Sequence, residues 1–193
     1  MDQDDIPFAS AEGLRFCKTA VLDDSRIRSV LKSFFKWSGL GLYRSIGARP
    51  GAYAFMQSDP DAEVEGLLVR LATKGSKATF WRGSHRCQWP STIGENNLWF
   101  VPRAALAKLR LFGVEPVTCI FEHGGLIIID PRVPTEIMEG ETTTFGFGTK
   151  EVLEGSWKPM KIPKTDDIEE VISIMESSDF GINKEYIEPQ RKR

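Results

Sequence analysis

Apolar residues recur in the N-terminal part of the chain with the period of a helix. They follow Asp23-Asp24-Ser25 at steps of three and four residues: Ile27, Val30, Leu31, Phe34 and Phe35. Aspartate and serine side chains accept hydrogen bonds from the free backbone donors at a helix start, so this pattern predicts an amphipathic helix that is capped there. Glycine permits the left-handed backbone found just past helix ends, which predicts that Gly39 and Gly41 end this helix.

Two further helices are predicted in the middle and near the end of the chain. Pro102 suits a first helical turn, because backbone N–H groups in that turn have no partner within the helix and proline has no such group to lose. Gly113 is predicted to end this helix. Its apolar face consists of Ala105, Leu106 and Leu109. The last helix begins at Asp166, with Glu169 three residues later as a reciprocal capping pair. The face predicted to pack against a sheet consists of Ile168, Val171, Ile172 and Met175.

Runs of β-branched and aromatic residues between these helices predict strands. Residues 67–73 are apolar except for Arg70, and Lys74-Gly75-Ser76 turns the chain into residues 77–82. This arrangement predicts a hairpin of two neighbouring antiparallel strands. Three more strands are predicted at residues 116–122, 126–130 and 142–149. The fold class indicated by these elements is α+β.

The size of the chain predicts one domain. A length of 193 residues is enough to bury a sizeable core. The hydrophobic fraction of 41% and the charged fraction of 27% are typical of an ordinary globular protein. We therefore predict a single domain over residues 1–193, with an N-terminal segment 1–22 and a C-terminal tail 184–193 at its periphery.

Charge and apolar runs argue against several classes of partner. A formal net charge of −2 lacks the basic excess of a nucleic-acid-binding protein, and Arg191-Lys192-Arg193 is interpreted as a solvated tail. No apolar run approaches the roughly 18 residues of a membrane span, and the acidic start is unlike a secretory signal. Neither a disulfide framework nor a zinc site is indicated by the three cysteines, Cys17, Cys87 and Cys119. The chain is predicted to be cytoplasmic, without nucleic-acid or membrane partners.

Two segments carry a resemblance to a known family. Residues 78–86 are an apolar strand that stops at Gly83-Ser84-His85, and residues 124–132 run from Gly124-Gly125 through an apolar strand to Asp130. In this order, these segments resemble the phytanoyl-CoA dioxygenase-like proteins, over about residues 67–148. The resemblance implies a cupin-like antiparallel β jelly roll, or double-stranded β-helix, with flanking helices.

The iron-binding residues of that family have no counterpart in this chain. The family holds iron through a His-x-Asp or His-x-Glu pair upstream of Gly-Ser-His and a later histidine, leaving positions open for 2-oxoglutarate and oxygen. Here the two histidines are His85, which matches a position that does not bind the metal, and His123. Thr135 or Glu136 lies near the position of the last ligand, and no convincing arginine follows to clamp 2-oxoglutarate. We therefore predict no metal ion and no cofactor.

Four polar residues within or next to the predicted strands are candidates for catalysis: His85, Arg132, Arg70 and Asp130. A histidine in a cavity can transfer a proton near neutral pH, whereas a turn histidine would only bind backbone. Arg132 either binds a carboxylate or an enolate, or forms a structural pair with Asp130. Arg70 either points outward or projects into the barrel as a polar anchor. Two further acid–base candidates occupy a tight turn that is predicted to be exposed, Glu122 and His123.

Five aromatic residues near the proposed barrel are candidates for substrate binding: Phe80, Trp81, Trp89, Trp99 and Phe121. Taken singly, each of them is better explained by core packing, whereas the five together indicate an apolar ligand. The leading hypothesis is a metal-independent enzyme that cyclises, isomerises or dehydrates an apolar metabolite in specialised metabolism. One alternative is a non-catalytic protein that binds a ligand or a partner, and another is an Fe(II)/2-oxoglutarate-dependent dioxygenase with replaced ligands. A homodimer is possible under each hypothesis.

Overall fold

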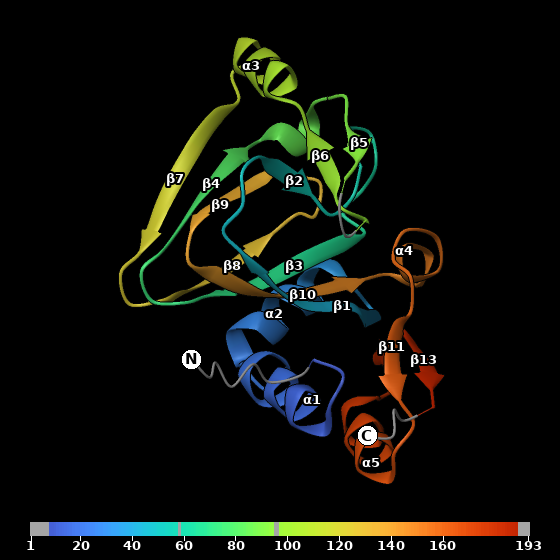
Figure 1. Ribbon diagram of the computed structural model, residues 1–193. Coiled ribbons are helices and arrows are strands. Elements are labelled where there is room, and N and C mark those ends of the chain that lie inside the picture. Colours follow the sequence, from blue (N-terminus) through green and yellow to red (C-terminus); the bar gives the residue numbers. More distant parts are fainter. Residues whose placement is uncertain (1–7, 58, 95–96, 189–193) are drawn as a thin grey trace. The chain divides into compact units, whose positions relative to one another are not determined.

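The computed structural model describes residues 8–57, 59–94 and 97–188 of the chain (Figure 1). The helices are α1 (Ala11–Cys17), α2 (Ser25–Phe34), α3 (Arg103–Leu111), α4 (Lys150–Gly155) and α5 (Asp166–Met175). A π-helical turn, η1 (Lys18–Leu22), follows α1, and a 3-10 turn, η2 (Ser84–Arg86), follows the fourth strand.

The strands up to α3 are β1 (Ser38–Gly47), β2 (Ala52–Ala54), β3 (Gly66–Ala72), β4 (Ser76–Arg82), β5 (Thr92–Ile93) and β6 (Trp99–Val101). Those after it are β7 (Glu115–Phe121), β8 (Gly125–Ile129), β9 (Thr135–Glu139), β10 (Glu141–Gly148), β11 (Met160–Pro163), β12 (Phe180–Ile182) and β13 (Lys184–Ile187).

Most strands belong to two sheets. One has five strands in the order β12-β1-β10-β3-β8, and the other has six in the order β5-β6-β2-β9-β4-β7. The pairs β1–β12 and β11–β13 are parallel, whereas the pairs β3–β8, β4–β7, β4–β9 and β2–β6 are antiparallel. The described residues therefore form an α+β protein with two mostly antiparallel sheets, which confirms the predicted fold class.

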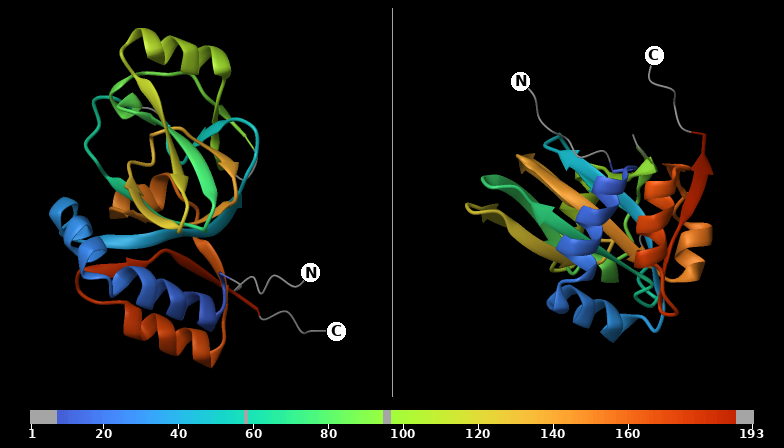
Figure 2. Two further views of the ribbon diagram at one scale, coloured as in Figure 1. Left: turned by 90° about the vertical axis from the view of Figure 1, so that its left-hand side faces the viewer. Right: turned by 90° about the horizontal axis from the view of Figure 1, so that it is seen from below.

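The chain divides into two compact units. Unit 1 contains the described residues up to Arg44 and from Phe145 onward, and unit 2 contains residues 45–144. In unit 1, helices α1 and α5 pack side by side (Figure 2). The N-terminal segment that was predicted to be peripheral contains α1, in which Leu14 and Cys17 are buried. No helix of the described residues is long and apolar enough to cross a membrane.

Helix α2 begins as predicted but ends earlier. The Asp24 carboxylate accepts a hydrogen bond from the backbone N–H of Arg26 at 2.8 Å, so the predicted cap is confirmed. The helix ends at Phe34, because Phe35 is already extended. Gly39 and Gly41 lie in β1 instead of ending the helix. At Gly41, a Cβ atom would come within 2.8 Å of the Trp157 ring, so close packing explains the glycine.

The predicted hairpin of residues 67–82 is wrong, although both of its strands exist. The turn after β3 leads the chain into the other sheet, where β4 pairs with β7 and β9, while β3 pairs with β8. Strands β7 and β8 likewise follow each other in sequence but belong to different sheets. Local sequence predicts a turn between two strands, but it does not say which strands will pair.

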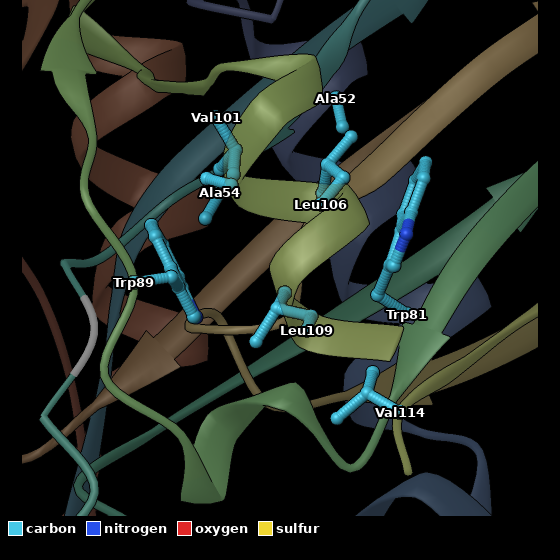
Figure 3. Close-up of a cluster of buried hydrophobic side chains, with 9 residues drawn as sticks. Ala52, Ala54, Trp81, Trp89, Val101, Leu106, Leu109 and Val114 are labelled. Carbon is cyan, nitrogen blue, oxygen red and sulfur yellow. The ribbon is translucent and has the colours of Figure 1, made fainter. Parts of the chain in front are cut away.

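Helix α3 covers an apolar cluster in unit 2. Its buried Ala105, Leu106 and Leu109 pack with side chains of β2, β4 and β6 (Figure 3). Gly113 follows this helix with a φ of +78°, as expected of a glycine at a helix end. The apolar faces predicted for α3 and α5 are both confirmed by burial. The capping pair predicted for α5 is wrong, because Thr165 precedes the helix and its side chain binds Asp167.

Candidate functional site

Arg70 lies in the middle of β3 with its side chain in the interior of unit 2. It is paired with Ile127 of the neighbouring strand β8. Only 2% of Arg70 is exposed, and its Nε atom has no hydrogen-bond partner among the described residues. Of the two orientations that the sequence leaves open for Arg70, the structure therefore has the inward one.

The Arg70 side chain lines a small cavity between strands of the two sheets. The remaining wall comes from β1, β2, β9 and the residues that flank β2, and it includes Ile46, Arg49, Tyr53, Phe55, Thr135 and Ile137. The volume of about 10 Å³ is room for one water molecule. The Arg70 cavity is thus apolar apart from two guanidinium groups, a phenol and a hydroxyl.

Aromatic rings face both guanidinium groups of this cavity. The Cζ atom of Arg70 lies 5.1 Å from the centroid of the Phe55 ring, and that of Arg49 lies 4.0 Å from the centroid of the Tyr53 ring. A desolvated cation–π contact contributes about 2 kcal/mol, whereas burial of an ion costs several kcal/mol. The Phe55 contact therefore offsets only part of the cost of burying Arg70.

Burial has a direct effect on the ionisation of Arg70. Burial first, and the positive charge of Arg49 second, together lower the pKa of the guanidinium to about 10. Arg70 is therefore still a cation at neutral pH. No ion pair compensates it among the described residues, since the seven ion pairs there involve other side chains. Such a group can bind a carboxylate or stabilise the oxyanion of an enolate.

Asp130 and Arg132 form a closed pair after β8. The Arg132 guanidinium donates to both Asp130 oxygens, with Nη2 at 2.7 Å from Oδ2 and Nε at 3.0 Å from Oδ1. The remaining nitrogen, Nη1, donates to the backbone carbonyls of Asp59 and Ala62 at 2.6 and 2.9 Å. Asp130 is the main cause of a raised Arg132 pKa. Of the two roles considered for Arg132, the geometry is that of a structural pair with Asp130. The bonds to the carbonyls of Asp59 and Ala62 also hold the segment before β3 in place.

His85 lies in η2, directly after β4, and is partly buried. Burial lowers its pKa, while the charge of Asp130 acts in the opposite direction. Its Nδ1 atom is buried and has no hydrogen-bond partner among the described residues, and the same is true of the hydroxyl of Ser84. The neutral form of His85 is therefore favoured, and the charges of Asp130 and Arg132 act on its pKa in opposite directions. It is not part of the wall of the Arg70 cavity.

Three of the candidate aromatic residues belong to the cluster under α3. Trp81 and Trp89 are buried there (Figure 3), at 6% and 2% exposure. Trp99 is partly buried and packs against the same cluster. The indole N–H of Trp89 donates to the backbone carbonyl of Ser84 at 3.2 Å. Their surroundings in the cluster are apolar side chains, as in core packing.

The other two aromatic candidates have different positions. Phe80 of β4 is paired with Thr135 of β9, and paired residues share a face of a sheet, so Phe80 lies on the face that borders the Arg70 cavity. Phe121 ends β7, and its ring lies where a Cβ atom at Gly125 would be. Glu122 and His123, the turn candidates, are exposed.

Sequence reasoning missed most of the cavity wall. The missed residues in or beside β2 are Arg49, Tyr53 and Phe55. This strand has only three residues, which is too few to show a period of polar and apolar positions. Thr135 belongs to β9, which was also not predicted, although Thr135 was placed near the last metal ligand of the family that the chain resembles. An arginine inside an apolar strand was the one signal of this cavity.

The donor set of the described residues does not suit a metal ion. No three side chains of histidine, cysteine, aspartate or glutamate come together there in a way that could hold one. No protein-family model matches the chain, and no curated protein matches it. The resemblance to the phytanoyl-CoA dioxygenase-like proteins thus stays a prediction.

Proposed function

We propose that this chain is a metal-independent enzyme that acts on an apolar small molecule bound at Arg70. The observation that carries this proposal is the burial of the Arg70 cation, which is 2% exposed and has no compensating ion pair among the described residues. An uncompensated buried charge is costly, and perturbed groups of this kind concentrate at functional sites. The ligand expected there bears a carboxylate or a carbonyl group on an apolar body.

The scaffold in this proposal is a cupin-like double-stranded β-helix. In such a jelly roll, successive strands alternate between two facing sheets. Support comes from the strand orders β1-β10-β3-β8 and β2-β9-β4-β7, in which β1, β3, β8 and β10 lie in one sheet and β2, β4, β7 and β9 in the other. The chain therefore passes to the other sheet at each step from β1 to β4 and again from β7 to β10.

Iron chemistry does not fit the residues of the Arg70 cavity. Thr135, near the position where the resemblance places the last iron-binding histidine, lines this cavity together with Tyr53 and Phe55. Non-haem iron sites use two histidines and a carboxylate, and none of these three side chains belongs to either type. The proposed reaction therefore contains no step at a metal.

In the proposed reaction, Arg70 polarises a carbonyl group. Its guanidinium donates hydrogen bonds to the substrate oxygen and stabilises the negative charge that develops there when a proton on the neighbouring carbon passes to a water molecule. Tyr53, whose side chain lines the same cavity, provides a hydroxyl that can donate a proton. Cyclisation, isomerisation and dehydration all use such a polarised carbonyl. A cavity of about 10 Å³ requires the side chains of its wall to move before a metabolite enters.

A second candidate function is non-catalytic binding of the same type of ligand. It is favoured by the cavity wall, in which the described residues include no histidine, aspartate or glutamate to act as a base. The two functions differ in one outcome. An enzyme changes the bound molecule, by rearrangement or by loss of water, whereas a binding protein returns it unchanged.

Benzoate binding tests the role of Arg70 in both functions. Benzoate and benzyl alcohol have the same apolar ring, but only benzoate carries a charge for Arg70. We expect benzoate to raise the thermal midpoint of the wild type more than benzyl alcohol does, and to raise that of Arg70→Met clearly less than that of the wild type. The control, Arg82→Met, removes an exposed arginine from the end of β4 and should respond like the wild type. Equal responses of wild type and Arg70→Met would contradict the proposal.

A further inference from the structure

A second and larger cavity lies in unit 1, independent of the Arg70 site. It has a volume of about 220 Å³ and is lined by η1, α2, the end of α5 and the segment that leads into β12. Cavities of about 150 Å³ in other proteins take up a molecule as large as benzene. The unit 1 cavity is therefore large enough for a small organic ligand.

Its inner wall is apolar. Leu31 and Phe35 at the end of α2 and Met175 at the end of α5 are each only 6% exposed, and all three line the cavity. Ile174, which also lines it, is 60% exposed. Apolar side chains therefore extend from the core of unit 1 to the surface, so the cavity offers contact for a hydrocarbon chain.

Its rim carries more cations than anions. Lys18 and Lys32 are each held by an aspartate, with Nζ of Lys18 2.8 Å from Asp23 Oδ2 and Nζ of Lys32 3.1 Å from Asp179 Oδ2. Two further cations in the lining have no such partner.

The uncompensated cations are Arg28 and Lys36. Arg28 Nη2 donates to the backbone carbonyl of Asp23 at 3.2 Å, and neither side chain forms an ion pair with any other described residue. Both lie on or just after α2, and the same cavity is lined by the buried Leu31 and Phe35. Uncompensated positive charge beside an apolar wall is complementary to an amphipathic anion.

We propose that the unit 1 cavity binds a small amphipathic anion, a short-chain carboxylate whose hydrocarbon part contacts Leu31, Phe35 and Met175. Arg28 and Lys36 bind the carboxylate at the rim. A cation of the same length gains the same apolar contacts but is repelled by this rim. An alcohol of that length gains the apolar contacts alone. Comparison of the three compounds therefore separates the apolar contribution to binding from the electrostatic one.

Hexanoate, hexan-1-ol and hexylammonium test this directly on the full chain. Each is titrated into isotopically labelled protein while the backbone amide signals of α2 and α5 are followed by NMR. We expect saturable binding of hexanoate, weaker binding of hexanol and the weakest of hexylammonium, with a dissociation constant for hexanoate that rises with ionic strength. Lys36→Glu is expected to weaken hexanoate binding about tenfold, equivalent to about 1.4 kcal/mol.

The matched control is Lys161→Glu, which makes the same charge change at an exposed position of β11 outside the cavity. It should bind hexanoate like the wild type. Both lysines are exposed, so neither change threatens folding, and the dispersion of the NMR signals checks this. Absence of saturable hexanoate binding would overturn the proposal. So would equal binding of hexanoate and hexylammonium, or equal affinities of Lys36→Glu and Lys161→Glu.

Discussion

Two buried arginines of unit 2 have opposite surroundings. Arg132 donates to one carboxylate and two backbone carbonyls, so every nitrogen of its guanidinium has an acceptor. Arg70 is buried more deeply, at 2% against 5% exposure, and its Nε has no acceptor among the described residues. The first arrangement stabilises the fold, while the second weakens it unless a ligand binds.

Replacing Arg70 with methionine is expected to stabilise the ligand-free protein. Methionine keeps much of the length of the side chain and removes the uncompensated charge, and replacing buried ionic groups by apolar ones often stabilises proteins by about 1 kcal/mol or more. The thermal midpoint should rise by about 2–4 °C for a chain of this size. Scanning calorimetry measures this shift, and a lower midpoint than that of the wild type would mean that Arg70 has a structural role.

The same replacement at Arg132 should have the opposite effect. Arg132→Met leaves the Asp130 carboxylate, which is itself largely buried, without its partner, and it frees two backbone carbonyls. Breaking one side of a buried ion pair costs about 3–5 kcal/mol. Urea denaturation should show a loss of this size, with Arg82→Met close to the wild type. A loss as small as that of Arg82→Met would disprove the structural role of the pair.

His85 is expected to make the stability depend on pH. Its folded-state pKa lies below 6.5, so as the pH falls through this value the unfolded chain takes up the proton first. The free energy of unfolding therefore decreases as the pH falls. Asp130 opposes this shift, whereas Arg86 and Arg132 reinforce it. Wild type should lose more stability than His85→Gln between about pH 7 and pH 5, in urea denaturation at each pH; parallel profiles would contradict this account.

Single residues were predictable from the sequence only where they broke a local pattern. Arg70 stood out because it interrupts an apolar strand, and its inward orientation then needed the structure. Arg49, Tyr53 and Phe55 interrupt no pattern, because the strand beside them has only three residues. What brings them to Arg70 is contact between strands far apart in sequence, which no local signal encodes.

Among the elements, Gly41 of β1 marks a position where α4 and the residue that follows it pack closely against a strand. A Cβ atom at Gly41 would meet the Trp157 ring at 2.8 Å and the Leu153 side chain even closer, whereas a Cβ atom at Gly47 would meet nothing within 4 Å. Leu153 belongs to α4, and Trp157 follows that helix. The absence of a side chain at Gly41 therefore sets how closely this part of unit 1 packs on β1.

Alanine at these two glycines should separate packing from backbone effects. Both changes reduce the conformational freedom of the unfolded chain equally, but only Gly41→Ala introduces a clash. Overpacking of a core typically costs about 1–3 kcal/mol. Urea denaturation should show a loss in this range for Gly41→Ala and a small gain of about 0.4–1 kcal/mol for Gly47→Ala. Similar results for the two variants would contradict the packing that we describe.

Helices with a long apolar period could be predicted from the sequence, whereas the pairing partners of the strands could not. Helices α2, α3 and α5 each have at least nine residues and an apolar face, and all three were found at or within two residues of the expected start. Strands β3 and β4 were also located, but they pair in different sheets. A turn of three residues can join two strands of a hairpin, or it can connect strands of different sheets. The turn between β3 and β4 was therefore predicted correctly, while the pairing of these two strands was wrong.

At the scale of the whole molecule, two strands extend through both compact units. Strands β1 and β10 each have residues on both sides of the boundary, at Arg44 and Ser45 and at Thr144 and Phe145. The proposed ligand sites divide between the units, with the Arg70 cavity in unit 2 and the cationic cavity in unit 1.

Native mass spectrometry of gently purified protein, with metal analysis of the same sample, tests whether the protein holds an organic ligand at Arg70. We expect an organic molecule bound to the wild type in a one-to-one ratio, no stoichiometric iron, and loss of that molecule in Arg70→Met but not in Arg82→Met. Incubation of the released molecule with fresh protein then separates an enzyme, which changes it, from a binding protein. Stoichiometric iron in the wild type, or an organic molecule that Arg70→Met and Lys36→Glu both retain, would contradict the proposal.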